Sequence, residues 1–122
     1  LRLLALRKTR LFGLTCDVEV DDGTAGRLPP TTAAHLYRIA QESLRNAALH
    51  GQATHCHVSL QSENDVAELA IRDDGRGFDP MHVAGDGIGL KIMKYRADQF
   101  GGTVEITSTP GDGALVRCRF AL

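Results

Sequence analysis

The sequence has no tryptophan, and aromatic residues make up only 5% of its 122 residues. It also lacks a run of roughly 18 or more apolar residues, the length of a membrane-spanning helix, so we expect no membrane contact by this domain. Acidic residues (15) and basic residues (14) are nearly equal in number, which leaves a formal net charge of -1. Without an excess of positive charge, the chain is not expected to bind nucleic acid.

Cysteine is scarce as well. Cys16, Cys56 and Cys118 are odd in number and far apart, which argues against a disulfide framework or a Cys-x-x-Cys metal site. Each lies in a strand-like pattern, so we expect three buried, reduced thiols, as is usual in the cytoplasm. In a strand, His55 and His57 would share the face opposite to Cys56, so these three side chains are not expected to bind one metal ion.

What the chain contains fits one domain with a single core, since 43% of its residues are hydrophobic. Residues 1–12 combine leucines with basic residues, and we predict that they are the end of a helix that continues from sequence outside this chain. Residues 13–122 are predicted to form the domain itself.

Alternation, helical periodicity and turn residues predict the order of the elements within the domain. The predicted elements are a strand (14–20), a loop (21–26), a helix that begins at Thr31 or Thr32 as N-cap and ends near His50, a hairpin (54–60 and 66–72), a glycine-rich loop, a helix (90–100) and a second hairpin (103–108 and 114–120).

The first of these helices has an apolar stripe with a polar border. The stripe consists of Leu36, Ile39, Ala40, Ser43, Leu44 and Ala47. Glu42, Asn46 and His50 follow one another at intervals of four residues along its edge. Such residues commonly bound a core and meet solvent, but a carboxylate and a carboxamide one turn apart can also hold a hydrated divalent cation. The helix alone leaves both interpretations open.

Two glycine-containing segments follow. Asp73 ends a predicted strand and is followed by Gly75 and Gly77, so a hydrogen-bond acceptor lies beside backbone that a ligand can approach closely. Residues 85–89 contain three glycines directly before a helix, an arrangement that suits phosphate. The chain has no Gly-Lys-Ser/Thr sequence, and no strand directly precedes residues 85–89, which excludes a P-loop and a dinucleotide fingerprint.

Taken together, these motifs resemble the GHKL ATP-binding fold and, more narrowly, the catalytic domain of bacterial sensor histidine kinases. The sequence of residues 41–46 (QESLRN) resembles that of the subfamily that contains nitrate/nitrite and lipid-fluidity sensors. The resemblance implies an α/β (α+β) two-layer sandwich, with a mixed, mainly antiparallel sheet and helices on one face. The motifs that carry it are residues 36–46 (LYRIAQESLRN), 73–79 (DDGRGFD), 87–90 (GIGL), 101–102 (GG) and 108–111 (STPG).

The resemblance also implies roles for single residues in binding ATP and Mg²⁺. Asn46 would coordinate the Mg²⁺ that bridges the phosphates, and Glu42 would polarise the nucleophile or organise the metal's waters. Asp73 would accept a hydrogen bond from the adenine amino group, while Gly75 and Gly77 let the base lie against backbone. The phosphates would be wrapped by the segment Gly87, Ile88, Gly89 and Leu90. His50 would either touch phosphate or cap its helix.

Three positions depart from the family pattern. Leu49 stands where many relatives have a basic residue, so one phosphate contact is missing or is supplied by Arg76, Lys91 or Lys94. Asp86 places a negative charge in the phosphate loop. Both departures suggest modest nucleotide affinity. Ala114 replaces a threonine that often follows the glycine of the last hairpin.

The implied activity is that of a cytoplasmic protein-histidine kinase. The phosphoryl group would pass from ATP to a histidine on dimerisation and phosphoacceptor helices outside this chain, and then to a response regulator. None of the five histidines lies in such a segment, so the isolated domain is expected to bind ATP but not to autophosphorylate. Two other interpretations are a stand-alone serine kinase of the anti-sigma type and a degenerate nucleotide-binding regulatory module.

Overall fold

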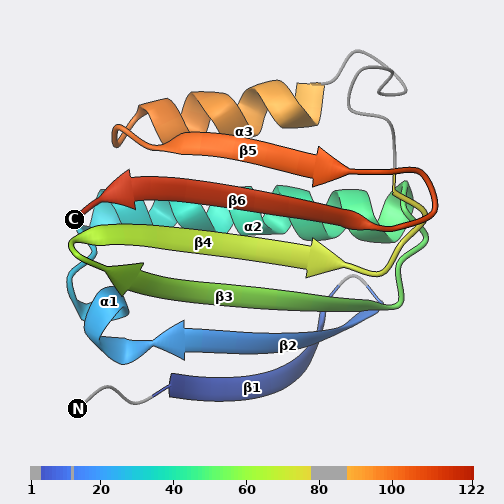
Figure 1. The fold of residues 1–122 in the computed structure, drawn as a ribbon, viewed down its shortest axis with the longest axis horizontal. Helices are drawn as coiled ribbons and strands as arrows, with labels where there is room; N and C mark the ends of the chain where they lie inside the picture. Colours follow the sequence, from blue (N-terminus) through green and yellow to red (C-terminus); the bar gives the residue numbers. More distant parts are fainter. Residues whose placement is uncertain (1–3, 12, 78–87) are drawn as a thin grey trace.

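A six-stranded sheet in the order β1-β2-β3-β4-β6-β5 forms one layer of the computed structural model, which describes residues 4–11, 13–77 and 88–122 (Figure 1). Only β2 and β3 are parallel, and each of the other neighbouring pairs is antiparallel. The mixed, mainly antiparallel sheet is therefore confirmed. The strands are β1 (Leu4–Leu11), β2 (Leu14–Asp21), β3 (His55–Glu63), β4 (Val66–Asp73), β5 (Thr103–Ser108) and β6 (Ala114–Ala121).

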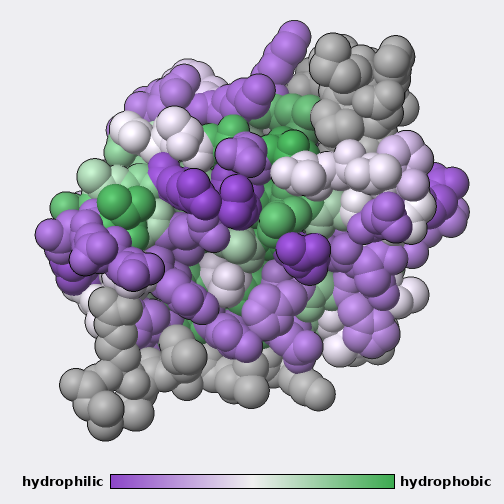
Figure 2. Space-filling model, viewed as in Figure 1, coloured by the Kyte–Doolittle hydropathy of each residue, from purple (hydrophilic) through white to green (hydrophobic). Residues whose placement is uncertain are grey.

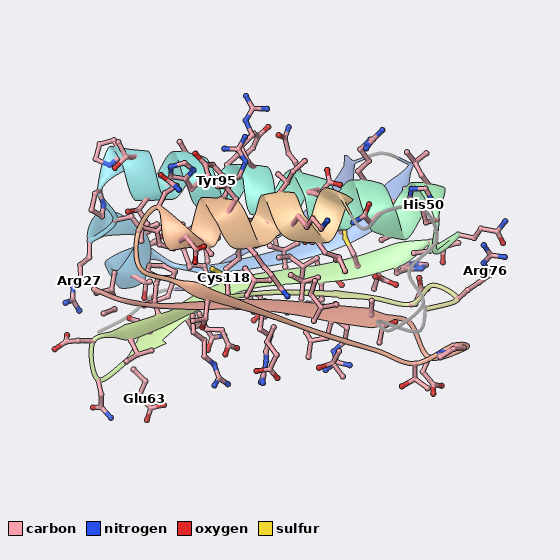
Figure 3. All side chains as sticks on the ribbon, turned by 90° about the horizontal axis from the view of Figure 1, so that it is seen from above. Arg27, His50, Glu63, Arg76, Tyr95 and Cys118 are labelled. Carbon is pink, nitrogen blue, oxygen red and sulfur yellow. A yellow bond between two sulfur atoms is a disulfide. The ribbon has the colours of Figure 1, made fainter. Side chains whose placement is uncertain are left out.

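Two helices, α2 (Pro30–Leu49) and α3 (Ile88–Asp98), lie side by side on one face of the sheet (Figures 1 and 3). The short helix α1 (Asp22–Gly26) follows β2 at the end of the sheet. This is the expected two-layer arrangement.

The core lies between the helices and the sheet. In the ladder, Ile71 pairs with Val58 on one side and Val116 on the other, so one apolar row crosses the middle strands on the helix-covered face. Met93 of α3 is buried, and its sulfur lies 3.4 Å from the Ser43 hydroxyl of α2. The apolar stripe of α2 is confirmed, since Leu36, Ile39, Ser43, Leu44 and Ala47 are buried and Ala40 is partly buried.

The opposite face of the sheet is open to solvent and carries charged pairs across neighbouring strands. Arg119 donates to Glu68 over 2.6 Å, and Arg117 donates to Glu105 over 3.3 Å. Figure 2 views the molecule from this side and shows hydrophilic residues over most of it. The helices and the site between them and the sheet therefore lie on the other side.

The prediction of a helix at residues 1–12 is wrong for residues 4–11, which form the edge strand β1, antiparallel to β2. Leu11 pairs with Leu14, so two residues join the strands, and Gly13 has a φ of 81°. Positive φ is what a two-residue hairpin turn demands. Over so short a segment, leucines interspersed with polar residues are compatible with the period of a helix and with that of a strand. Pairing with β2 favours the strand.

Smaller predictions about the helices are also wrong. The helix predicted at 90–100 is α3, which spans Ile88–Asp98, so Ile88 and Gly89 lie in the helix and not in the loop before it. Residues 22–26, expected as part of a loop, form α1, because the Asp21 carboxylate accepts from the backbone N–H of Thr24 (3.2 Å) and from its hydroxyl (2.6 Å). Neither Thr31 nor Thr32 caps α2. Pro29 is the N-cap and Pro30 the first helical residue, a position that needs no N–H donor.

The prediction of three reduced thiols is wrong for Cys16 and Cys56, which form a disulfide. The parallel pairing of β2 and β3 places them directly opposite each other, with their Cα atoms 4.8 Å apart. The pairing of these strands is not visible in the sequence, because 40 residues separate the two cysteines. Cys118 is a free, buried thiol, and burial raises its pKa to about 11.

Candidate functional site

Asp73 is the last residue of β4, and its side chain lies on the helix-covered face of the sheet. Side chains alternate along a strand, so Asp73 faces the same way as the buried Leu69 and Ile71. Its Oδ1 accepts from the backbone N–H of Gly75 over 2.8 Å. Burial raises the pKa of this carboxyl group, an effect that the N–H groups of Gly75 and Ala114 oppose. The result is a half-buried, oriented carboxylate with room for further donors, since a carboxylate offers about four acceptor positions.

The two glycines after Asp73 are packed against backbone of other segments. A Cβ at Gly75 would lie 2.6 Å from the carbonyl oxygen of Gly51, and one at Gly77 would lie 2.7 Å from that of Gly113. Gly77 also has a φ of 68°. The fold itself therefore requires glycine at both positions, a reason separate from the base contact that the sequence indicates.

Glu42 and Asn46 lie on the edge of α2 that faces α3, and both are partly buried. A Cβ at Gly89 would lie 2.5 Å from Oε1 of Glu42 and 3.3 Å from Nδ2 of Asn46. The first turn of α3 is thus packed against both side chains. Of the residues predicted for the phosphate end of the site, the structure brings these three together, and Leu90 follows as part of the same turn, packed against the core.

His50 is the exposed C-cap of α2, and its backbone N–H donates to the carbonyl oxygen of Asn46 over 2.9 Å. Of the two roles predicted for His50, its backbone therefore fills the capping role. Asp86, Gly87 and the side chain of Ile88 lie outside the described residues.

The arrangement around Gly89 suits an anion together with a cation. The N-terminus of an α-helix attracts negative charge through its free N–H groups and its dipole. Carboxylate and carboxamide oxygens, such as those of Glu42 and Asn46, are ligands that Mg²⁺ accepts. The helix N–H groups suit a phosphate chain, and the oxygens of Glu42 and Asn46 suit Mg²⁺ bound to it. Asp73 offers an acceptor for an amino group elsewhere on the same ligand.

A groove of about 630 Å³ lies beside this site, in the part of the chain that the structure describes. It is formed by the turn after β4, the α2–β3 connection and the β5–β6 loop, and it does not include Glu42 or Asn46. The lining residues are Gln52, Asp74, Gly75, Arg76, Gly77, Pro110 and Gly111.

Asp74 is a residue whose role the sequence interpretation missed. Its Oδ1 accepts from the backbone N–H groups of Thr54 (2.9 Å) and His55 (3.0 Å), and its Oδ2 accepts from the Thr54 hydroxyl (2.9 Å). These hydrogen bonds, the one from His55 first, lower the pKa of Asp74 to about 2. Two consecutive aspartates at a strand end were the available signal: one caps the start of β3, and the other faces the site.

Replacing Asp74 with asparagine should make the free energy of unfolding depend less on pH in the acidic range. The pKa of Asp74 is depressed in the folded state, so its contribution to stability is present above its ordinary pKa of about 4 and is lost as pH falls toward 2. We expect urea midpoints of the native chain to fall more steeply between about pH 5 and pH 2 than those of Asp74→Asn. Asp98→Asn, an exposed aspartate on α3, serves as control, and parallel curves for the Asp74 variant and the native chain would contradict this role.

Within the described residues, no helix is long and apolar enough to span a bilayer. The same residues contain no group of three or more His, Cys, Asp or Glu side chains placed to hold a metal ion.

Residues 31–122 match a family model described as histidine kinase-, DNA gyrase B-, and HSP90-like ATPase. Two relatives are named as kinases. The chain is 32% identical over 94 residues to the signal transduction histidine-protein kinase/phosphatase DegS of Brevibacillus brevis, covering 77% of this chain and 24% of that protein. It is 36% identical over 85 residues to the sensor histidine kinase LiaS of Bacillus subtilis, covering 70% and 24%. The chain thus spans about a quarter of the length of these relatives.

Solved structures show the same fold. The blue-light activated histidine kinase EL346 of Erythrobacter litoralis superposes with a TM-score of 0.74 over 90% of this chain and 36% of that one, at 21% identity. The ATP binding domain of PrrB from Mycobacterium tuberculosis superposes with a TM-score of 0.63 over 88% of this chain and 73% of that one, at 28% identity.

Proposed function

The chain belongs to the family of histidine kinase-, DNA gyrase B-, and HSP90-like ATPases, and from this membership we propose that it is the ATP-binding catalytic domain of a sensor histidine kinase. The names of DegS and LiaS support the histidine kinase over the other members of the family. Because the chain spans about a quarter of each relative, the domain acts in this proposal within a longer protein.

One observation carries the proposal: the backbone of Gly89, in the first turn of α3, lies against the side chains of Glu42 and Asn46. The phosphates would lie at this helix end, with Asn46 as the protein ligand to Mg²⁺. When bound, Mg²⁺ neutralises phosphate charge during transfer. Glu42 would orient the attacking histidine or the waters on the metal, so that positioning and charge neutralisation supply most of the catalysis.

The base would lie at the other end of the site. Asp73 would accept a hydrogen bond from the adenine amino group, with Gly75 and Gly77 keeping the turn close to the base. A guanine presents a carbonyl oxygen at that position, which the carboxylate would repel, so Asp73 would favour ATP over GTP. The remaining nucleotide contacts proposed are His50, Gly87, Ile88 and Leu90.

The proposal extends to the partners of the domain. The phosphoryl acceptor would be a histidine on the dimerisation helices of the same kinase, and a response regulator would take the group from there. We further propose that the chain belongs to the subfamily of the nitrate/nitrite and lipid-fluidity sensors, which the sequence of residues 41–46 (QESLRN) supports. We also propose a cytoplasmic location, where ATP is available.

Phosphotransfer should require helices supplied from outside this chain. We expect that the domain, mixed with labelled ATP, Mg²⁺ and a protein containing the dimerisation and phosphoacceptor helices, transfers label to a histidine of that protein. The domain alone should acquire none, because none of its five histidines lies in a sequence segment of the dimerisation and phosphoacceptor type. The measurement is the acid-labile, base-stable label on each protein after separation.

Asn46→Ala is the control for this experiment, since it removes the proposed Mg²⁺ ligand and should abolish transfer. Label on the 122-residue chain in the absence of the helices would contradict the proposal, as would undiminished transfer by the Asn46 variant.

A further inference from the structure

Arg76 lies in the middle of the turn after β4 and makes three hydrogen bonds to two other segments. Its guanidinium Nη2 donates to the carbonyl oxygen of His50 over 3.0 Å, and its backbone N–H donates to that of Gly51 over 2.6 Å. Its own carbonyl oxygen accepts from the backbone N–H of Gly111 in the β5–β6 loop. Arg76 therefore joins the end of α2, the turn after Asp73 and the last hairpin.

The end of α2 needs such a contact. The last carbonyl groups of a helix have no partners within it, and cations near them are favoured. The last turn of α2 contains no basic residue. Arg76 supplies the missing cation from another part of the chain, and Figure 3 shows it at the same end of the molecule as His50.

Two of the segments that Arg76 joins, the end of α2 and the turn after Asp73, carry the two ends of the proposed nucleotide site. The C-terminal turn of α2 begins at Asn46, whose carbonyl oxygen accepts from the N–H groups of His50 and Gly51. The other segment, the turn after β4, directly follows Asp73. It contains Gly75, which packs on the carbonyl group of Gly51. The position of Asp73 relative to Asn46 thus depends on this junction.

We propose that Arg76 is a positioning residue that fixes the base-recognising end of the site at the correct distance from the metal-binding end. This inference rests on the proposed function. It also assigns Arg76 a role different from a phosphate contact, because its guanidinium donates to the carbonyl oxygen of His50, the C-cap of α2. ATP contacts both ends of the site at once. If the contact between the two segments is lost, the affinity for ATP therefore falls more than the affinity for the base alone or for the phosphates alone.

The test compares a whole ligand with its two halves. Binding of ATP·Mg²⁺, adenosine and Mg²⁺-tripolyphosphate is measured by NMR titration of the native chain, Arg76→Ala and Arg76→Lys. In Arg76→Ala the dissociation constant for ATP·Mg²⁺ should rise about tenfold, as for the loss of one charge-assisted hydrogen bond, while those for adenosine and tripolyphosphate change less than about twofold. Arg76→Lys should restore most of the ATP affinity, because it keeps a cation and a donor.

Arg72→Ala is the matched control, since Arg72 is an exposed arginine four positions earlier, on β4, and its side chain lies on the open face of the sheet. The backbone hydrogen bonds of residue 76 remain in Arg76→Ala, so the turn is expected to stay folded. Equal weakening of tripolyphosphate would show a direct phosphate contact and overturn the proposal, and so would unchanged ATP affinity or equal weakening of all three ligands. Failure of the native chain to bind ATP·Mg²⁺ would instead refute the proposed function.

Discussion

Asp73→Asn should abolish ATP binding and leave the fold intact. The carboxylate is the proposed acceptor for the adenine amino group, and a hydrogen bond to a charged, partly buried acceptor contributes up to about 3 kcal/mol, or roughly 100-fold in affinity. An asparagine has the same shape as an aspartate but no charge, and an NH₂ donor group replaces one of the two acceptor oxygens of the carboxylate. Isothermal titration with ATP·Mg²⁺ should therefore detect no binding at concentrations that saturate the native chain.

The stability of this variant should be at least that of the native chain. Burial raises the pKa of Asp73, which means that the folded state disfavours its ionised form. A neutral side chain at this position removes that penalty while keeping an acceptor for the Gly75 N–H. Thermal unfolding should thus show an unchanged or slightly higher midpoint. Asp74→Asn makes the same chemical change one residue later, outside the proposed base contact, and should retain ATP binding. Normal ATP affinity in Asp73→Asn would refute the base-recognition role.

Removing the disulfide between Cys16 and Cys56 should have the largest effect on stability. The two residues are 40 positions apart, and the loop that they close contains the whole of α2. Closing a loop of this length is expected to stabilise the folded state by about 4 kcal/mol, because it restricts the unfolded chain. The urea midpoint should fall accordingly when a reductant is added or when both cysteines are replaced by alanine.

The double cysteine variant also serves as the control for the reductant, which should not change its midpoint further. Thiol titration gives an independent check: without reductant, the denatured native chain should expose one reactive thiol, that of Cys118. Three reactive thiols would contradict the disulfide.

Much of the fold was predictable because its signals are local. The stripe on α2 repeats with the helical period, and both later hairpins are marked by alternation and turn residues, so their positions follow from short segments of sequence. The hairpin of β3 and β4 is an example: the sequence predicts a turn over residues 61–65. The structure extends β3 to Glu63 and leaves Asn64 and Asp65 as the turn, both with the positive φ that a two-residue hairpin requires. The order of the motifs in turn sufficed to predict the two-layer fold.

The sequence by itself predicted which residue types form the site: an aspartate at the end of a strand, a carboxylate and a carboxamide on one helix edge, and glycines directly before the next helix. The tertiary structure alone decided that residues 4–11 form a strand, that Cys16 and Cys56 are bonded, and that Arg76 joins α2 to the turn after Asp73. The physical reason is the same in each case. These features depend on which distant segments lie next to each other, and a pattern read along one segment carries no information about its neighbour in space.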